Sequence, residues 1–281
     1  MSMLNPTQMC DNYMDAAVGK TASPTWRLIV LGIAAGAFVA LGAVCSSAAA
    51  FQVDNVGLGR VVTGLVFPVG LCMVVFLGTE LFTGNALMVN AALEKKITWR
   101  RLFRNWALVY LGNFIGAITV AFLMVNFGQL ELGSQGLAVY TAKVAAAKSS
   151  LPWQNAFVLG IFCNILVCIA VYMGSSAKDT AGKIIALYLP IFIFVIASFE
   201  HCIANMYYIP AGIMAFMNES YNGLITEAGI NTAVLNFGTF FTANLIPVTL
   251  GNIVGGVLVG LLMYFSHGTR AKKQAAAKLN Q

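Results

Sequence analysis

Two long apolar stretches of this chain are each interrupted near their middle by an acidic, turn-prone segment. The segments are Gly78–Asn85 and Ser198–Asn205, and each contains a glutamate followed five positions later by an asparagine. A carboxylate at the depth of a bilayer costs about 2.5 to 3.5 kcal/mol, so matched carboxylates indicate a polar path rather than an accident. Glu80 and Glu200 therefore predict two broken helices that line a permeation site.

Composition excludes a soluble domain. Hydrophobic residues make up 59% of the 281 residues, charged residues only 9%, and the mean hydropathy is +0.81. We therefore predict an all-α integral membrane protein. Six stretches are long enough to span a bilayer, with the second and fifth broken: Arg27–Phe51, Leu58–Leu93, Leu102–Phe127, Pro152–Met173, Lys183–Met217 and Ala243–Phe265.

The basic residues predict the orientation. If the N-terminus is cytoplasmic, all of the 16 Lys and Arg residues lie on the cytoplasmic side except Arg60, Lys143 and Lys148. This asymmetry follows the positive-inside rule and predicts a multi-pass protein of the plasma membrane, the inner membrane of a bacterial cell, with both termini cytoplasmic. No removable signal peptide is predicted. Membrane topology and contact with anionic lipid account for the net charge of +6, and no nucleic-acid partner is expected.

We expect three regions along the chain. Residues 1–25 form a cytoplasmic amphipathic helix, because Asn5 and Pro6 are a typical helix start and apolar residues then recur at helical spacing. This helix could gate the inner mouth of a pore, but we favour a position on the membrane surface. Residues 26–267 form the six-helix transmembrane domain, and residues 268–281 form a cytoplasmic tail.

An internal repeat divides the transmembrane domain into halves at about 26–127 and 152–267. Asn105 and Asn113 in the third span match Asn244 and Asn252 in the sixth, eight positions apart in both, and each second asparagine follows Leu-Gly. Three spans is an odd number, so the second half must cross the membrane in the opposite sense. The sequence thus predicts an inverted 3+3 repeat whose two breaks meet near the midplane.

Polar residues at the breaks have predicted structural roles. We expect Glu80 and Glu200 to cap the first NH groups of the half-helices that follow them, which would neutralise both carboxylates locally. Paired asparagines are expected to bond to exposed backbone groups and hold the gaps open rather than touch solute. The asparagines at or near the breaks are Asn85, Asn105, Asn113, Asn205, Asn244 and Asn252.

Donors at the breaks favour an anion. His201 lies inside one break, next to the unpaired amides and positive dipole end of the half-helix beginning near Cys202, and Thr83 adds a hydroxyl at the other. Lys148, on the outer flank, would raise the local concentration of small anions. The alternatives are a structural histidine and an interfacial lysine that reaches lipid headgroups.

The sequence resembles the formate/nitrite transporter family over nearly its whole length. The stretches that carry the resemblance are Glu80–Thr83, Ile97–Trp99, Asn105–Asn113, Phe199–Met206 and Asn244–Asn252. The resemblance implies a homopentamer of aquaporin-like protomers, each with its own pore for formate, nitrite, hydrosulfide or a similar monovalent anion. It also implies that Thr83 and His201 form the central site, that Lys148 attracts or polarises the anion, and that Asn164 supports the site. The implied constrictions are Phe67, Leu71, Phe82 and Phe194.

The mechanism that we expect is anion permeation, with a proton step left open. An imidazole with an ordinary pKa of about 6.5 could hand a proton to a weak-acid anion, which would then cross the apolar rings as a neutral molecule. The sequence does not choose among formate, nitrite, hydrosulfide and chloride. Nor does it decide between a passive channel and proton-coupled transport.

Two other classes of protein are less consistent with these residues. A neutral-solute channel of the aquaporin type predicts paired Asn-Pro-Ala motifs, and the chain has none. A membrane enzyme needs a metal cluster or a nucleophile–base pair, and the chain has only 2 histidines, one of them near the C-terminus. We therefore expect no enzymatic activity, no metal and no cofactor.

Overall fold

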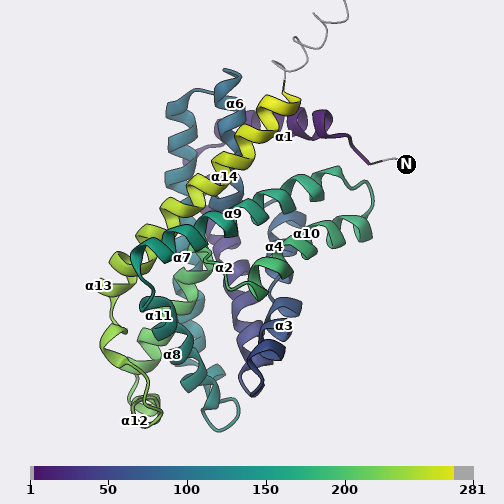
Figure 1. Cartoon of the computed structure of the whole chain (residues 1–281). Helices are drawn as coiled ribbons and strands as arrows, with labels where there is room; N and C mark the ends of the chain where they lie inside the picture. Colours follow the sequence, from purple (N-terminus) through teal and green to yellow (C-terminus); the bar gives the residue numbers. More distant parts are fainter. Residues whose placement is uncertain (1–2, 269–281) are drawn as a thin grey trace, which may run out of the picture.

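The computed structural model describes residues 3–268, and every regular element in that range is helical. The helices form an elongated bundle with α1 (Pro6–Ala22) across one end and α12 (Glu219–Glu227) at the other (Figure 1). This agrees with the predicted all-α fold. Apart from Gly268, the predicted tail 268–281 lies outside the described residues.

The first half of the bundle begins with one continuous helix, continues with a broken one and ends with another continuous helix. The predicted second span also bends at Pro68, because a proline lacks the NH that would continue the helix. The elements in order are α2 (Thr25–Ala50), α3 (Val56–Val66), α4 (Val69–Phe76), α5 (Phe82–Asn85), η1 (Ala86–Met88), α6 (Val89–Leu93) and α7 (Trp99–Asn126).

The second half repeats this plan. Its elements are α9 (Trp153–Ser176), the broken pair α10 (Thr180–Ile196) and α11 (Cys202–Met217), a π-helical turn η4 (Phe240–Leu245) and α14 (Ile246–His267). In the part of the chain that the structure describes, 5 helices are long and apolar enough to span a membrane. The remaining predicted span is the broken pair, whose two pieces are each too short.

The connection between the halves contains a helix that the sequence patterns did not reveal. This helix, α8 (Gly136–Ser149), packs against α11 and carries Lys148 in its last turn. The other short connecting elements are η2 (Gln129–Glu131), η3 (Thr232–Val234) and α13 (Phe237–Thr239). Lys148 therefore lies on a helix packed within the bundle and not in a surface loop.

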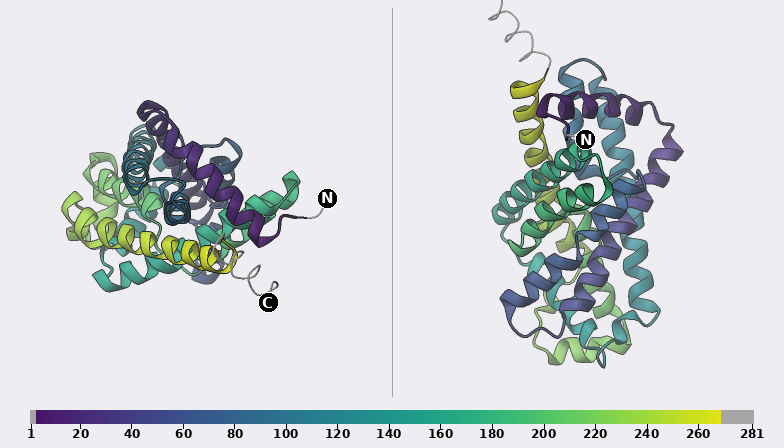
Figure 2. Two further views of the ribbon diagram at one scale, coloured as in Figure 1. Left: turned by 90° about the horizontal axis from the view of Figure 1, so that it is seen from above. Right: turned by 90° about the vertical axis from the view of Figure 1, so that its right-hand side faces the viewer.

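The N-terminal helix α1 begins at the predicted residues, but it packs on the helical bundle and not on the membrane surface. Asn5 and Gln8 bond to each other's backbone NH, which is a complete capping box. Cys10, Met14 and Ala17 are fully buried, and α1 packs on α6, α7, α9 and α14. The prediction that α1 rests on the membrane surface is therefore wrong, because the helix lies across the end of the bundle (Figure 2) and buries its apolar side chains against it.

Both helix breaks are made by the same backbone turn. At the first break, the NH groups of Gly78 and Thr79 bond back to the carbonyls of Val75 and Val74, and Gly78 has a φ of 61°. This is the pattern of a Schellman motif, in which a left-handed residue ends a helix.

At the second break, Ser198 takes the place of the glycine with a φ of 56°, and Phe199 bonds back to Phe194. A serine in this conformation carries a backbone cost of roughly 1–2 kcal/mol. The predicted breaks in the second and fifth spans are therefore confirmed.

Glycines bring the long helices of each half into backbone contact. A Cβ on Gly116 of α7 would lie 2.0 Å from the carbonyl oxygen of Ile33 in α2. In the other half, a Cβ on Gly255 of α14 would lie 2.2 Å from the carbonyl oxygen of Ile161 in α9. Small residues at matched places thus set the same close packing twice.

We predict that Gly116→Ala destabilises the fold by about 1–3 kcal/mol, because the added methyl would overlap backbone that cannot move aside. The measurement is the thermal unfolding midpoint of the detergent-solubilised protein. Gly223→Ala is the control, since a Cβ there meets nothing within 4 Å. An equal midpoint for Gly116→Ala and the unmodified chain would contradict this packing.

Candidate functional site

Asn113 holds the first helix break in place. Its Oδ1 accepts from the NH of Phe82 at 3.0 Å, which satisfies the first free amide of the half-helix. Its Nδ2 donates to the carbonyls of Gly32 at 2.8 Å and Glu80 at 2.9 Å. One fully buried amide thus satisfies three backbone groups that water cannot reach.

Asn252 does the same at the second break. Its Oδ1 accepts from the NH of Cys202 at 2.9 Å, and its Nδ2 donates to Gly160 at 2.7 Å and Glu200 at 2.9 Å. The prediction that these two asparagines bond to backbone groups of the broken helices is confirmed. The matched contacts agree with the predicted repeat of three spans, while its inverted sense stays a prediction.

The two glutamates do not cap the half-helices as predicted, because each one binds a lysine and an asparagine instead. Glu80 Oε2 accepts from Lys20 Nζ at 2.9 Å and from Asn85 Nδ2 at 2.7 Å. Asn85 also donates to Asn105 Oδ1 at 2.9 Å, and its own Oδ1 accepts from Lys20. The Glu80 side chain is only 7% exposed, so the lysine supplies the compensating charge that burial requires.

Glu200 has the equivalent arrangement. Its Oε1 accepts from Lys148 Nζ at 2.8 Å, and its Oε2 accepts from Asn205 at 2.6 Å and from Asn244 at 3.2 Å. Lys148 Nζ also lies 5.5 Å from the centre of the Tyr208 ring. Lys148 is therefore held inside the protein and does not reach lipid headgroups.

Lys20 is a residue of this site that the sequence patterns missed. A signal was present: Lys20 precedes Gly32 by the same interval that separates Lys148 from Gly160, within the Leu-Gly-Ile motifs that open each half. Lys20 precedes the predicted repeat, which begins at about residue 26, so the repeat pattern alone does not point to it.

Thr83 and His201 meet at the centre of the protein. Thr83 Oγ1 lies 3.0 Å from His201 Nε2, and His201 Nδ1 accepts from the backbone NH of Ala204 at 3.1 Å. A ring nitrogen that accepts carries no proton, so this bond assigns the proton of the neutral imidazole to Nε2. Nε2 then donates to Thr83, whose own hydroxyl hydrogen is available to another acceptor. His201 rather than Glu200 thus caps α11.

Asn164 supports Thr83 through the backbone. Its Nδ2 donates to the carbonyl of Thr83 at 3.2 Å and to that of Asn252 at 2.5 Å. Cys168 Sγ donates to the same Thr83 carbonyl at 3.7 Å. These contacts agree with the supporting position that the resemblance implied for Asn164.

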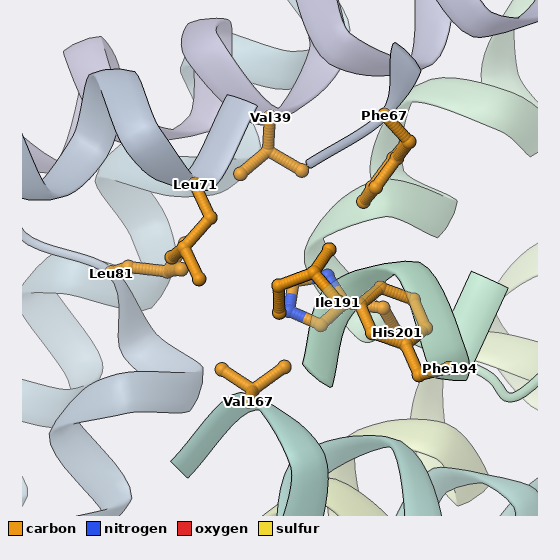
Figure 3. Close-up of a pocket in the computed structure, with 8 residues that line it drawn as sticks. All are labelled: Val39, Phe67, Leu71, Leu81, Val167, Ile191, Phe194 and His201. Atoms are coloured by element: carbon orange, nitrogen blue, oxygen red, sulfur yellow. The ribbon is translucent and has the colours of Figure 1, made fainter. Parts of the chain in front are cut away.

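A small cavity of about 10 Å³ opens beside His201, with room for roughly one water molecule. Three of the predicted constriction residues line it: Phe67, Leu71 and Phe194 (Figure 3). Phe82 lies outside the lining, since its ring packs on Tyr110 and Trp106 with centroid separations of 4.8 and 6.0 Å. Except for His201, the residues that surround the cavity are apolar.

Four further residues line the cavity and were not predicted: Val39, Leu81, Val167 and Ile191. The repeat again contained a signal. Val39 and Val167 each follow the glycine of a Leu-Gly-Ile motif by seven positions, and Leu81 stands where the other break has His201. Pairing each candidate with its repeat equivalent finds Leu81 from His201 and Ile191 from Leu71, whereas Val39 and Val167 pair only with each other.

Residues 3–268 contain no group of three or more His, Cys, Asp or Glu side chains arranged to bind a metal ion.

The chain is similar to proteins of known family. Residues 7–266 match the family model described as formate/nitrite transporter. The chain is 39% identical to the formate channel FocA of Haemophilus influenzae, over 91% of this chain and 91% of that protein. It is 35% identical to FocA of Escherichia coli K12, over 92% and 93% of the two chains.

Solved structures give the same result. A pentameric formate channel with formate bound superposes with a TM-score of 0.76 at 36% identity, covering 86% of this chain and 96% of that one. An ion channel of the FNT family superposes with a TM-score of 0.78 at 25% identity, covering 92% and 99%. With the matched breaks, the paired asparagines and the central Thr83–His201 contact, these similarities establish that the chain belongs to the formate/nitrite transporter family.

Proposed function

We propose that this protein conducts small monovalent anions, namely formate, nitrite or hydrosulfide, through a pore in each protomer of a homopentamer. The observation that carries the proposal is the Thr83–His201 pair beside an apolar cavity, between two helix breaks. Two relatives are named formate channels, and one similar structure is a pentameric channel with formate bound. The transmembrane domain would be residues 26–267.

The electrostatics of the breaks suit an anion. The half-helix α11 begins next to His201, so its dipole adds positive potential at the cavity. Glu80 and Glu200 would repel an anion if they stood alone, but each is paired with a lysine at 2.8–2.9 Å. Lys20 on α1 and Lys148 on α8 thus cancel the charges of the two carboxylates beside the Thr83–His201 site.

The cavity opposes a bare charge, and two routes past it are available. In the first route, the anion accepts a hydrogen bond from the Thr83 hydroxyl, while His201 Nε2 donates a hydrogen bond to the Thr83 oxygen. In the second, His201 first gains a proton and passes it to the anion, which crosses as a neutral acid. Protonation of Nδ1 would break its bond to the Ala204 amide, so the second route requires α11 to lose its cap.

Membrane placement follows from the charges and the apolar surface. Large apolar side chains are exposed along the long helices, including Trp26, Phe122, Ile185 and Leu262, and these would face lipid or neighbouring protomers. The end that carries α1 is rich in Lys and Arg, which supports cytoplasmic termini in a plasma membrane. We infer a channel without enzymatic activity.

A neutral-solute channel is the alternative function. This alternative requires that the rate of uptake depend neither on the charge of the solute nor on Lys20 and Lys148. The positive end of the α11 dipole beside His201 favours the anion channel, because a neutral solute gains nothing from positive potential at the cavity.

We predict that His201→Asn separates the capping role of the histidine from its proton role. Asparagine is a good N-cap, so α11 keeps an acceptor for the Ala204 amide and the protein stays folded. If the imidazole supplies protons, formate uptake by proteoliposomes loses its rise at acidic pH. A pH profile identical to that of the unmodified protein would rule out the proton route. His201→Phe, which removes both ring nitrogens, is the comparison variant.

We predict that Lys148→Met lowers both stability and transport. It leaves the Glu200 carboxylate buried without a counter-charge, which costs about 3–5 kcal/mol. The double variant Lys148→Met/Glu200→Gln removes both charges and should recover the unfolding midpoint while formate uptake stays low. Uptake at the unmodified rate in the double variant would mean that the lysine charge is not needed.

The overall proposal is tested by parallel planar-bilayer current and proteoliposome uptake with formate, nitrite, hydrosulfide and chloride across a pH series. Anion-selective current establishes a channel and ranks its substrates. Uptake without current, accompanied by internal acidification, indicates that anion and proton cross together. Equal permeation by an uncharged solute such as glycerol would instead support the alternative.

A further inference from the structure

The two halves of the bundle differ at one turn, which contacts the Lys148–Glu200 ion pair. Before α14, the chain forms the π-helical turn η4, in which the Ile246 amide bonds to the carbonyl of Phe241, five residues back. In the first half, the matching region is regular α-helix within α7. Such π turns are rare and are frequently found at functional sites.

A single residue explains the difference. Pro247 follows Asn244 by three positions, and Leu108 follows Asn105 by the same interval. A proline has no NH to donate, and its ring crowds the carbonyl four residues earlier. The wider π turn relieves this crowding, whereas Leu108 imposes no such demand on α7.

The π turn contains Asn244, which makes more contacts than its counterpart. Asn244 Nδ2 donates to the backbone carbonyl of Lys148 at 3.0 Å and to Glu200 Oε2 at 3.2 Å. Asn244 Oδ1 also accepts from Asn205 at 2.7 Å. The side chain is fully buried.

In the other half, Asn105 Oδ1 accepts from Asn85, but Asn105 Nδ2 has no hydrogen-bond partner among the described residues. Its amide therefore contacts neither the lysine nor the carboxylate of its own ion pair. The same residue type at the same place in the repeat thus has two different sets of contacts.

We propose that Asn244, presented by the Pro247 π turn, is a positioning residue for Lys148. One amide group ties the backbone of the lysine to the carboxylate that the lysine binds. With Oε2 of Glu200 occupied by Asn205 and Asn244, Oε1 is left to face the ammonium. Lys20 has no such brace, so the two ends of the pore hold their lysines differently.

The inference rests on the proposed anion conduction and predicts an effect on one side only. If Lys148 meets the anion that enters from its end, loosening the lysine weakens anion binding from that end. Binding from the Lys20 end depends on contacts that the change does not touch. A merely structural role would instead lower the maximal rate equally in both directions.

The test uses Pro247→Leu, which restores the residue of the other half, and Asn244→Ala, which removes the amide. Thr242→Ala is the matched control, because Thr242 lies in the same turn with its side chain exposed. Initial rates of formate uptake are measured against formate concentration in right-side-out and inside-out membrane vesicles.

We expect both variants to raise the half-saturating formate concentration about three- to tenfold from the Lys148 end, the effect of weakening one charge-assisted contact. From the Lys20 end, the half-saturating concentration stays within error of the unmodified protein, as does Thr242→Ala from both ends. An unchanged value from the Lys148 end, or an equal change from both ends, would overturn the proposal. If Pro247→Leu fails to assemble, Asn244→Ala decides.

Absence of formate uptake by the unmodified protein in both orientations would refute the proposed function rather than the positioning role. The positioning role then has its own readout in an experimental structure of Pro247→Leu. A regular α-helix at residues 240–245, with Asn244 turned away from the Lys148 carbonyl, supports it. A retained π turn with the Asn244 contacts intact would refute it.

Discussion

The structure depends on two buried amides that replace water at the helix breaks. A helix that stops within a membrane leaves free NH and carbonyl groups in a medium that cannot solvate them. Asn113 and Asn252 each bond to an NH and a carbonyl of their own break and to a carbonyl of the neighbouring continuous helix, and in doing so they join three segments of their own half. Once the breaks are held in this way, a lysine–carboxylate pair and a central polar contact can be accommodated beside them.

The symmetry of the breaks and the asymmetry of the centre have different functions. Both halves use the same Schellman turn, the same capping asparagine and the same glutamate–asparagine–lysine contacts. The residues that would meet the solute are not duplicated: His201 stands opposite Leu81 in the repeat, and Thr83 opposite Ile203. In the proposed channel, the repeated parts therefore build the frame, and the unrepeated residues supply the chemistry.

Much of this could be predicted from the sequence, because the strongest signals are local. The apolar spans, the turn residues at the breaks and the cap at Asn5 follow from composition and short motifs. The partners of Glu80 and Glu200 could not be predicted this way, since they lie on helices 60 and 52 residues distant along the chain. Helix α8 was missed because its alanine-rich sequence lacks a clear apolar face and is too short to span. The position of α1 depends on tertiary packing, which helical periodicity does not report.

The N-terminal helix has a consequence for how the protein is assembled. Tyr13 donates to the carbonyl of Gly84 at 2.7 Å, Lys20 binds Glu80, and the same helix packs on α14. The first helix to be synthesised can therefore reach its full set of contacts only after the last span has entered the membrane. Until then α1 lacks its packing against α14, so this end of the bundle is completed last although α1 is made first.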